Sequence, residues 1–157
     1  VPFLRPKYLA SNKATTKDLI EHICKKVDYH DYFIIIQPTS PLRMSEDIDN
    51  ALSLCQKEKA YSVVSVTENL KNSNCLYYLN YNNQLKPSIK TTKKDLEKKL
   101  FVLNGAVYVL RFNNIIKHKA IIGKKTFGYK MPLERSIDID TKLDWEVAKL
   151  IYKGKHI

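Results

Sequence analysis

The chain has 157 residues, 44% of them hydrophobic, which suits one globular domain over residues 1–157 with a core of its own. No run is long and apolar enough to span a bilayer and no secretory leader is recognisable, so we expect a cytoplasmic protein without membrane contact. The three cysteines form no Cys-x-x-Cys pair and the histidines show no metal-ligand spacing, which argues against a disulfide framework and a zinc site.

The net charge of +11 raises the possibility of a nucleic-acid partner. Only four of the 27 basic residues are arginines, however, and arginine is the side chain that reads bases and phosphates in a bidentate manner. The lysines are also scattered among apolar residues, as on an ordinary surface. The composition therefore favours a small anionic ligand, such as a nucleotide or an acidic sugar, over a nucleic acid.

A loop and a helix are predicted before the apolar run that starts at Phe33. Residues 1–11 contain Pro2 and Pro6 and predict an extended loop. Thr15 and Asp18 then form a capping pattern for a helix with an apolar face made by Leu19, Ile20, Ile23, Cys24 and Val27.

The run from Phe33 to Ile36 is apolar without alternation, which predicts a central strand covered on both faces, as in a parallel sheet. Pro38 and Pro41 should end the pairing, because proline has no N–H for a sheet ladder. The strand then delivers polar side chains to its carboxyl end, where ligands bind in open α/β sheets: Gln37, Thr39, Ser40 and Arg43. A purely structural turn fits the same pattern.

Strand and helix signals alternate after this turn. A helix from Ser45 is followed by a strand over 61–66, which completes a β-α-β unit and predicts an α/β fold. Residues 68–100 read as an excursion with a hairpin that turns at Asn82 and Asn83. Asn104-Gly105 predicts a tight turn or bulge, since both residues tolerate positive φ.

The remaining elements are a short helix over 113–118, a strand over 127–129 and a last helix. Thr141 and Asp144 form the capping box of that last helix, which should end near Gly154.

Asp138 and Asp140 are the strongest candidates for chemistry. In an extended segment both carboxylates point to one side. Two converging carboxylates repel unless a cation or proton lies between them, and with a phosphate substrate that cation would be Mg²⁺. Spacing alone leaves an alternative, in which Asp140 caps the last helix and Asp138 is solvated.

Glycine is scarce: the four glycines form no loop that could cradle a triphosphate. A nucleotide enzyme with this sequence would lack the usual phosphate grip.

Five motifs in order and spacing resemble the acylneuraminate cytidylyltransferases, also called CMP-sialic acid synthetases. The motifs are Phe3-Leu-Arg-Pro with Leu9-Ala-Ser, Gln37-Pro-Thr-Ser-Pro-Leu-Arg43, Ser62-Val-Val-Ser-Val66, Asn104-Gly-Ala-Val-Tyr108 and Ser136-Ile-Asp-Ile-Asp-Thr141. The resemblance implies a three-layer, Rossmann-like nucleotide-diphospho-sugar-transferase fold with a mainly parallel sheet. It also implies a cytidylyltransferase that joins a nine-carbon 2-keto acid sugar of the sialic, legionaminic or pseudaminic type to CMP from CTP, with Mg²⁺ and release of pyrophosphate.

The resemblance also assigns roles to residues. Asp138 and Asp140 would hold the metal, and Asp140 would help to deprotonate the attacking hydroxyl. The expected sugar-binding residues are Gln37, Arg43, Lys94, Asn104 and Tyr108, and the expected nucleotide-binding residues are Arg5, Ala14 and Thr16. Lys94 replaces an arginine of the family and keeps its charge without the bidentate fork.

Two further expectations follow from the resemblance. The excursion over 68–103 matches the dimerisation arm of the family, so we expect a homodimer. The first third of the family, with its triphosphate loop, has no counterpart here, so the fold is expected to be N-terminally incomplete and turnover by this chain very weak or absent. The alternative is a catalytically inactive, truncated remnant that binds sugar and dimerises.

Overall fold

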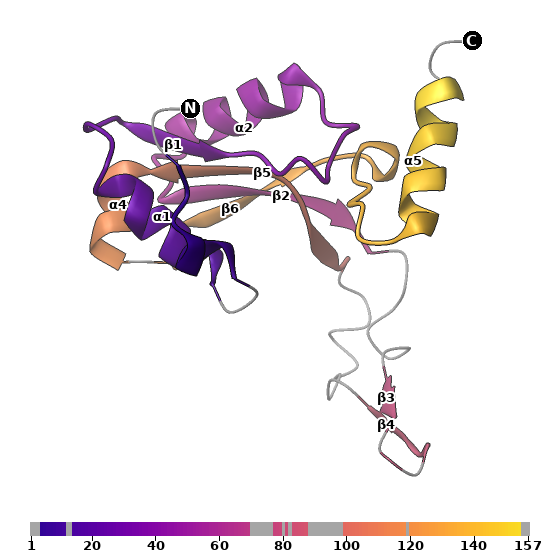
Figure 1. Ribbon diagram of the computed structural model, residues 1–157. Coiled ribbons are helices and arrows are strands. Elements are labelled where there is room, and N and C mark those ends of the chain that lie inside the picture. The colour runs from indigo at the N-terminus through magenta and orange to yellow at the C-terminus, as the bar shows by residue number, and fades with distance from the viewer. Residues whose placement is uncertain are drawn as a thin grey trace. The chain divides into compact units, whose positions relative to one another are not determined.

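Four strands form the main sheet, in the order β1-β5-β2-β6 (Figure 1). This computed structural model describes residues 4–11, 14–69, 77–79, 81, 83–87, 99–118 and 120–154. The strands are β1 (Tyr32–Ile35), β2 (Ser62–Glu68), β3 (Tyr77–Leu79), β4 (Leu85–Pro87), β5 (Phe101–Arg111) and β6 (Thr126–Lys130). The helices are η1 (Lys7–Ala10), α1 (Thr16–Cys24), α2 (Ser45–Lys57), α4 (Phe112–His118), η3 (Leu133–Arg135) and α5 (Lys142–Gly154).

The α/β class is confirmed, but the sheet is mixed. β5 runs antiparallel to β1, with Ile35 opposite Tyr108. Its other neighbour, β2, also runs the opposite way, because the hydrogen bonds join Arg111 to Tyr61 at one end and Leu100 to Asn69 at the other.

β2 and β6 run in parallel, since Tyr61 bonds to Lys125 and Val66 to Met131. Two of the three pairings are therefore antiparallel, and the expectation of a mainly parallel sheet is wrong for these strands. β1 and β2 do run in the same direction, as a β-α-β unit requires. The difference arises because β5 returns from the excursion and inserts between them.

β1 lies at an edge of the described sheet and is not the central strand that its apolar run predicts. Ile34 and Ile36 are 36% and 49% exposed. An unbroken apolar run reports that a strand favours burial, whereas its position in the sheet depends on pairing with residues far away in the sequence.

The chain divides into two compact units, and the division falls within β2 and β5. The first comprises Val1–Gln37, Met44–Val64 and Val107–Tyr129, and the second Pro38–Arg43, Ser65–Ala106 and Lys130–Ile157.

In the first unit, α2 lies on one side of the sheet and α1 and α4 on the other, which gives three layers (Figure 1). The core on the side of α1 and α4 is formed by Ile20, Leu110 and Ile115, with Phe33 and Ile35 of β1 packed against it. Helix α2 buries Ala51 and Cys55 completely. Burial raises the pKa of the Cys55 thiol, so it behaves as a small apolar side chain.

Local sequence signals are confirmed at both capping boxes. The Asp18 N–H donates to the Thr15 hydroxyl, and the Thr15 N–H donates to the Asp18 carboxylate. Thr141 and Asp144 make the same pair of bonds before α5. Residues 7–10, in contrast, form the 3-10 helix η1 and not an extended loop, because Leu9 is buried and its N–H reaches the Pro6 carbonyl.

The excursion contains the predicted hairpin, in which β3 and β4 pair antiparallel and Asn83 has a positive φ of 58°. Asn104-Gly105 does not turn the chain, because β5 continues through it. The expected positive φ occurs nonetheless, at Gly105, with a value of 73°. A side chain at this position would be strained.

Asp144→Asn is expected to lower the free energy of unfolding near pH 7 and to have less effect in acid. The hydrogen bond from the Thr141 hydroxyl, and then that from its N–H, lowers the pKa of Asp144 from its usual 3.8. A carboxylate with a lowered pKa stabilises the fold above its unfolded pKa, and this contribution is lost as pH falls through the folded value. Denaturant unfolding from about pH 7 to about pH 3 measures the change. Asp28→Asn, at an exposed loop position, is the control. The prediction would be contradicted if the free energy of unfolding of Asp144→Asn differed from that of the unmodified protein by the same amount at every pH.

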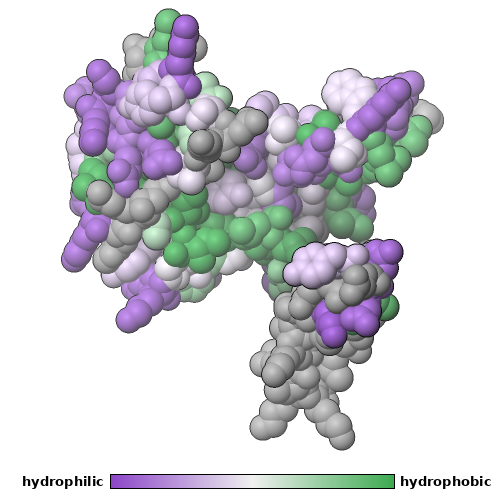
Figure 2. All heavy atoms as spheres, turned by 60° about the horizontal axis from the view of Figure 1, so that its bottom comes forward, coloured by the Kyte–Doolittle hydropathy of each residue, from purple (hydrophilic) through white to green (hydrophobic). Residues whose placement is uncertain are grey.

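No helix among the described residues is long and apolar enough to cross a membrane. Several large apolar side chains are nevertheless exposed, and Figure 2 shows hydrophobic patches between hydrophilic side chains.

Candidate active site

The Pro-Thr-Ser-Pro turn and the aspartate segment lie side by side in the second unit. The N–H of Ile139, between Asp138 and Asp140, donates to the Thr39 carbonyl at 2.9 Å. Two motifs at opposite ends of the chain are thus joined by a main-chain bond. Asp138 and Asp140 flank the point where they meet.

Asp138 and Asp140 differ in their surroundings. Asp138 is half-buried, and its Oδ1 is a buried oxygen for which the described structure contains no hydrogen-bond partner. Asp140 is exposed, and its N–H donates to the Asp144 carboxylate at 3.2 Å. The cap of α5 is Thr141, so the Asp140 carboxylate does not serve as the cap of this helix.

This arrangement suits Mg²⁺ better than a cation held by protein alone. A buried carboxylate oxygen without a donor is costly unless something compensates it, and a cation would do so. Among the residues described, no group of three or more His, Cys, Asp or Glu side chains could hold a metal. Mg²⁺ is commonly held by one or two carboxylates, with substrate phosphates and water completing its coordination.

Asn104 is 4% exposed and its side-chain amide makes several hydrogen bonds inside the second unit. Its Nδ2 donates to the Ser136 hydroxyl at 2.8 Å and to the Met131 sulfur at 3.5 Å. Its Oδ1 accepts from the Ser65 hydroxyl at 2.6 Å and from the Ala106 N–H at 3.3 Å. Both amide donors and two acceptor positions are therefore in use.

Arg43 and Ser40 connect the turn to β5. The Arg43 guanidinium donates to the Ala106 carbonyl at 2.8 Å, and the Ser40 hydroxyl donates to the Asn104 carbonyl at 3.5 Å. Ser40 is fully buried. Hydrogen bonds from the side chains of Ser40 and Arg43 therefore hold the turn against β5.

The first unit contains the other predicted site residues that are described. Gln37 and Tyr108 are half-buried, and Tyr108 lies in β5 opposite Ile35 of β1. The Arg5 guanidinium donates to the Leu9 carbonyl, which ties it to η1. Thr16 is the first residue of α1.

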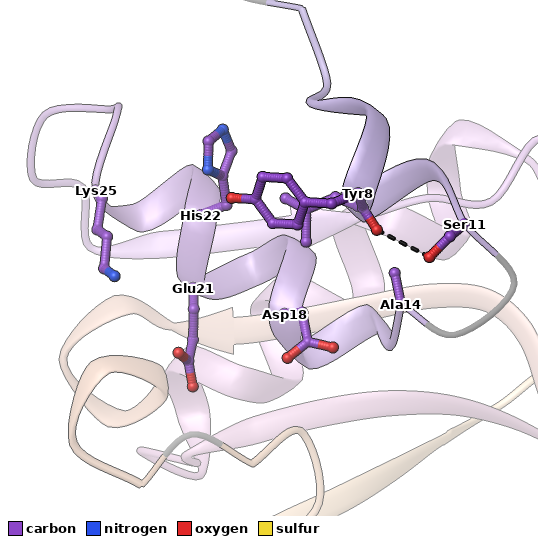
Figure 3. A pocket seen from close by; sticks show the side chains of 8 residues that line it. Tyr8, Ser11, Ala14, Asp18, Glu21, His22 and Lys25 are labelled. Atoms are coloured by element: carbon purple, nitrogen blue, oxygen red, sulfur yellow. Dashed lines mark hydrogen bonds between the residues drawn. The ribbon is translucent and has the colours of Figure 1, made fainter.

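Ala14 lines a hollow of about 400 Å³ between η1 and α1 (Figure 3). The other lining residues are Tyr8, Leu9, Ser11, Asp18, Glu21, His22 and Lys25. The predicted base-reading position therefore borders a cavity. The capping box already takes the N–H groups of Thr15 and Asp18, which leaves fewer donors for a base at this helix start.

Lys94 lies outside the described residues. Reasoning from sequence assigned no role to Ser65 or Ser136, although both lie within the quoted motifs. The position of Ser65 between Val64 and Val66 in the strand Ser62–Glu68 is a signal that could have identified it, because buried hydroxyls need partners.

Comparison with curated proteins identifies relatives along almost the whole chain. The CMP-N,N'-diacetyllegionaminic acid synthase of Legionella pneumophila is 32% identical over 95% of this chain and 67% of its own length. The chain belongs to the acylneuraminate cytidylyltransferase family. The N-acylneuraminate cytidylyltransferase of Escherichia coli O18:K1:H7 is also 32% identical, over 98% of this chain. The pseudaminic acid cytidylyltransferase of Campylobacter jejuni is 26% identical over 99% of it.

This chain spans 37% of the length of the Escherichia coli cytidylyltransferase and 70% of that of the Campylobacter jejuni protein. No family model matches it. The family assignment thus rests on individual relatives, and the three described above are named for cytidylyl transfer or CMP-sugar synthesis and differ in the sugar named.

Proposed function

We propose that the protein transfers CMP from CTP to a nine-carbon 2-keto acid sugar and releases pyrophosphate. Family membership supports the reaction class. The observation that carries the proposal is the buried, unpartnered Asp138 Oδ1 beside the Thr39-Ile139 bond. A site for a cation beside the Pro-Thr-Ser-Pro turn is what nucleotidyl transfer requires, because the substrate brings several negative charges.

In this reaction the anomeric hydroxyl oxygen of the sugar forms a bond to the α-phosphorus of CTP, and the bond to pyrophosphate breaks. Bound Mg²⁺ would neutralise charge on the phosphates. Asp138 and Asp140 are the residues that would hold it. Asp140, which is exposed, is proposed to accept the hydroxyl proton.

The sugar and the nucleotide are proposed to contact different groups of residues. Gln37, Tyr108, Arg43 and Lys94 are proposed to contact the sugar, and the Lys94 ammonium its carboxylate. Arg5, Ala14 and Thr16 are proposed to contact the nucleotide, which Ala14 supports because it borders a hollow. We also propose a homodimer formed through residues 68–103.

The test is product formation by the purified protein with CTP, Mg²⁺ and, in turn, N-acetylneuraminic, legionaminic and pseudaminic acid. We expect CMP-sugar and pyrophosphate in equal amounts with one of the sugars, formed at a low rate. Sugar binding without product would support the inactive remnant and overturn the proposal. Asp140→Asn with full activity would overturn the role given to that carboxylate, and size-exclusion chromatography with light scattering tests the dimer.

A further inference from the structure

We infer that Asn104 is a positioning residue that holds the metal-binding segment in place, and that it is not a sugar ligand. This inference rests on the proposed function, because it concerns the metal assigned to Asp138. Asn104 lies in β5, and the segment that carries the aspartates follows η3.

The side-chain amide of Asn104 already has hydrogen-bond partners within the protein. It is 4% exposed and makes four hydrogen bonds within the protein. A sugar hydroxyl could bind only by displacing one of these partners. A side chain with buried partners on both its oxygen and its nitrogen has the pattern of a framework residue.

The amide nitrogen of Asn104 donates to the part of the chain that leads into the aspartate segment. Nδ2 reaches Met131 and Ser136, which lie on either side of η3, shortly before Asp138. The Ser136 hydroxyl donates in turn to the Pro132 carbonyl at 2.8 Å. Asn104 therefore fixes the entry of the chain into the aspartate segment.

The hydrogen bonds that start at Asn104 form a closed ring through the aspartate segment and the Pro-Thr-Ser-Pro turn. From Ser136 the chain continues to Ile139, whose N–H bonds to the Thr39 carbonyl. Ser40, which follows Thr39, donates its hydroxyl to the main-chain carbonyl of Asn104. Asn104 thus holds both the aspartate segment and the turn beside it.

The unpartnered Asp138 Oδ1 lies in the segment that this ring fixes. A carboxylate that must meet a cation without a donor of its own depends on its main chain for orientation. Groups that orient metal ligands affect metal affinity, typically by 10- to 100-fold when they are removed. Asn104 and Ser136 are expected to act in this way.

The experiment measures binding of Mn²⁺, as a probe for Mg²⁺, to the protein without substrates by electron paramagnetic resonance. Ser136→Ala removes the hydroxyl that accepts from the Asn104 amide and donates to the Pro132 carbonyl, and Asn104→Leu removes the amide at similar volume. Both are expected to raise the Kd for Mn²⁺ by about tenfold or more. Ser136→Thr keeps the hydroxyl and should restore the affinity, and Ser53→Ala, on the exposed side of α2, should leave it unchanged.

The outcomes separate this inference from the proposed function. Unchanged Mn²⁺ binding in Asp138→Asn would overturn both. If Asp138→Asn loses the ion while Ser136→Ala and Asn104→Leu bind it like the unmodified protein, the inference alone is wrong. A raised KM for the sugar in Asn104→Leu, with the Kd for Mn²⁺ unchanged, would make Asn104 a sugar contact and also overturn it. Circular dichroism of each variant establishes that it is folded.

Discussion

Asp138→Asn is expected to lower kcat/KM for CMP-sugar formation by about a thousandfold, because stabilisation of phosphoryl charge by a bound metal is worth several kcal/mol. The amide keeps the shape of the carboxylate but presents a weaker ligand and, in one orientation, a donor. The buried position of Oδ1 means that water cannot easily take its place.

The measurement is a steady-state assay over a range of Mg²⁺ concentrations. Asp49→Asn, on the exposed surface of α2, is the matched control and should keep full activity. If Asp138→Asn reaches the unmodified rate at high Mg²⁺, its carboxylate does not take part in transfer.

Ile20→Ala is expected to have the largest effect on stability, with a loss of about 3 kcal/mol in the free energy of unfolding. Ile20 lies in α1, is 2% exposed and belongs to the core with Leu110 and Ile115. Truncation removes buried apolar surface and leaves a cavity that the surrounding sheet and helices cannot fill completely.

Denaturant unfolding followed by circular dichroism measures this loss. Ile116→Ala is the control, because it makes the same change in helix α4 at a side chain that is 51% exposed. Equal losses in the two variants would show that the core assignment is wrong.

The helix ends were predictable from the sequence because capping is local. Thr15 and Asp18 lie three residues apart, as do Thr141 and Asp144, and each pair makes its bonds whatever the rest of the chain does. The hairpin around Asn83 was also predictable, because its turn depends on residues that are close together in the sequence.

The position of β1 was not predictable in this way. Phe33 and Ile35 pack on the core, whereas Ile34 and Ile36 are exposed, although all four are equally apolar in the sequence. Packing against α1 and α4 decides which face of β1 is covered, and its place in the sheet depends on pairing with β5, which joins residues as far apart as Ile35 and Tyr108.

The residues of the candidate site remain predictions, whereas the contact between the two segments that carry them is visible only in the structure. The spacing of Asp138 and Asp140 pointed to a cation, and the polar turn pointed to a ligand edge. The bond between them uses the main chain of Ile139 and Thr39, which carries no sequence signal. Asn104-Gly105 predicted a tight turn or a bulge, and of these the turn is absent, because β5 continues through both residues.

The bonds around Asn104 also have a consequence for folding kinetics. Ser40 and Asn104 lie 64 positions apart in the chain, and Arg43 and Ala106 lie 63 apart. Loop closure over such separations costs chain entropy before any bond forms, so contacts of this kind slow folding. In a refolding experiment the helical circular dichroism signal should therefore return before Mn²⁺ binding does, and no short peptide that carries Asp138 and Asp140 alone should bind the ion as the folded protein does.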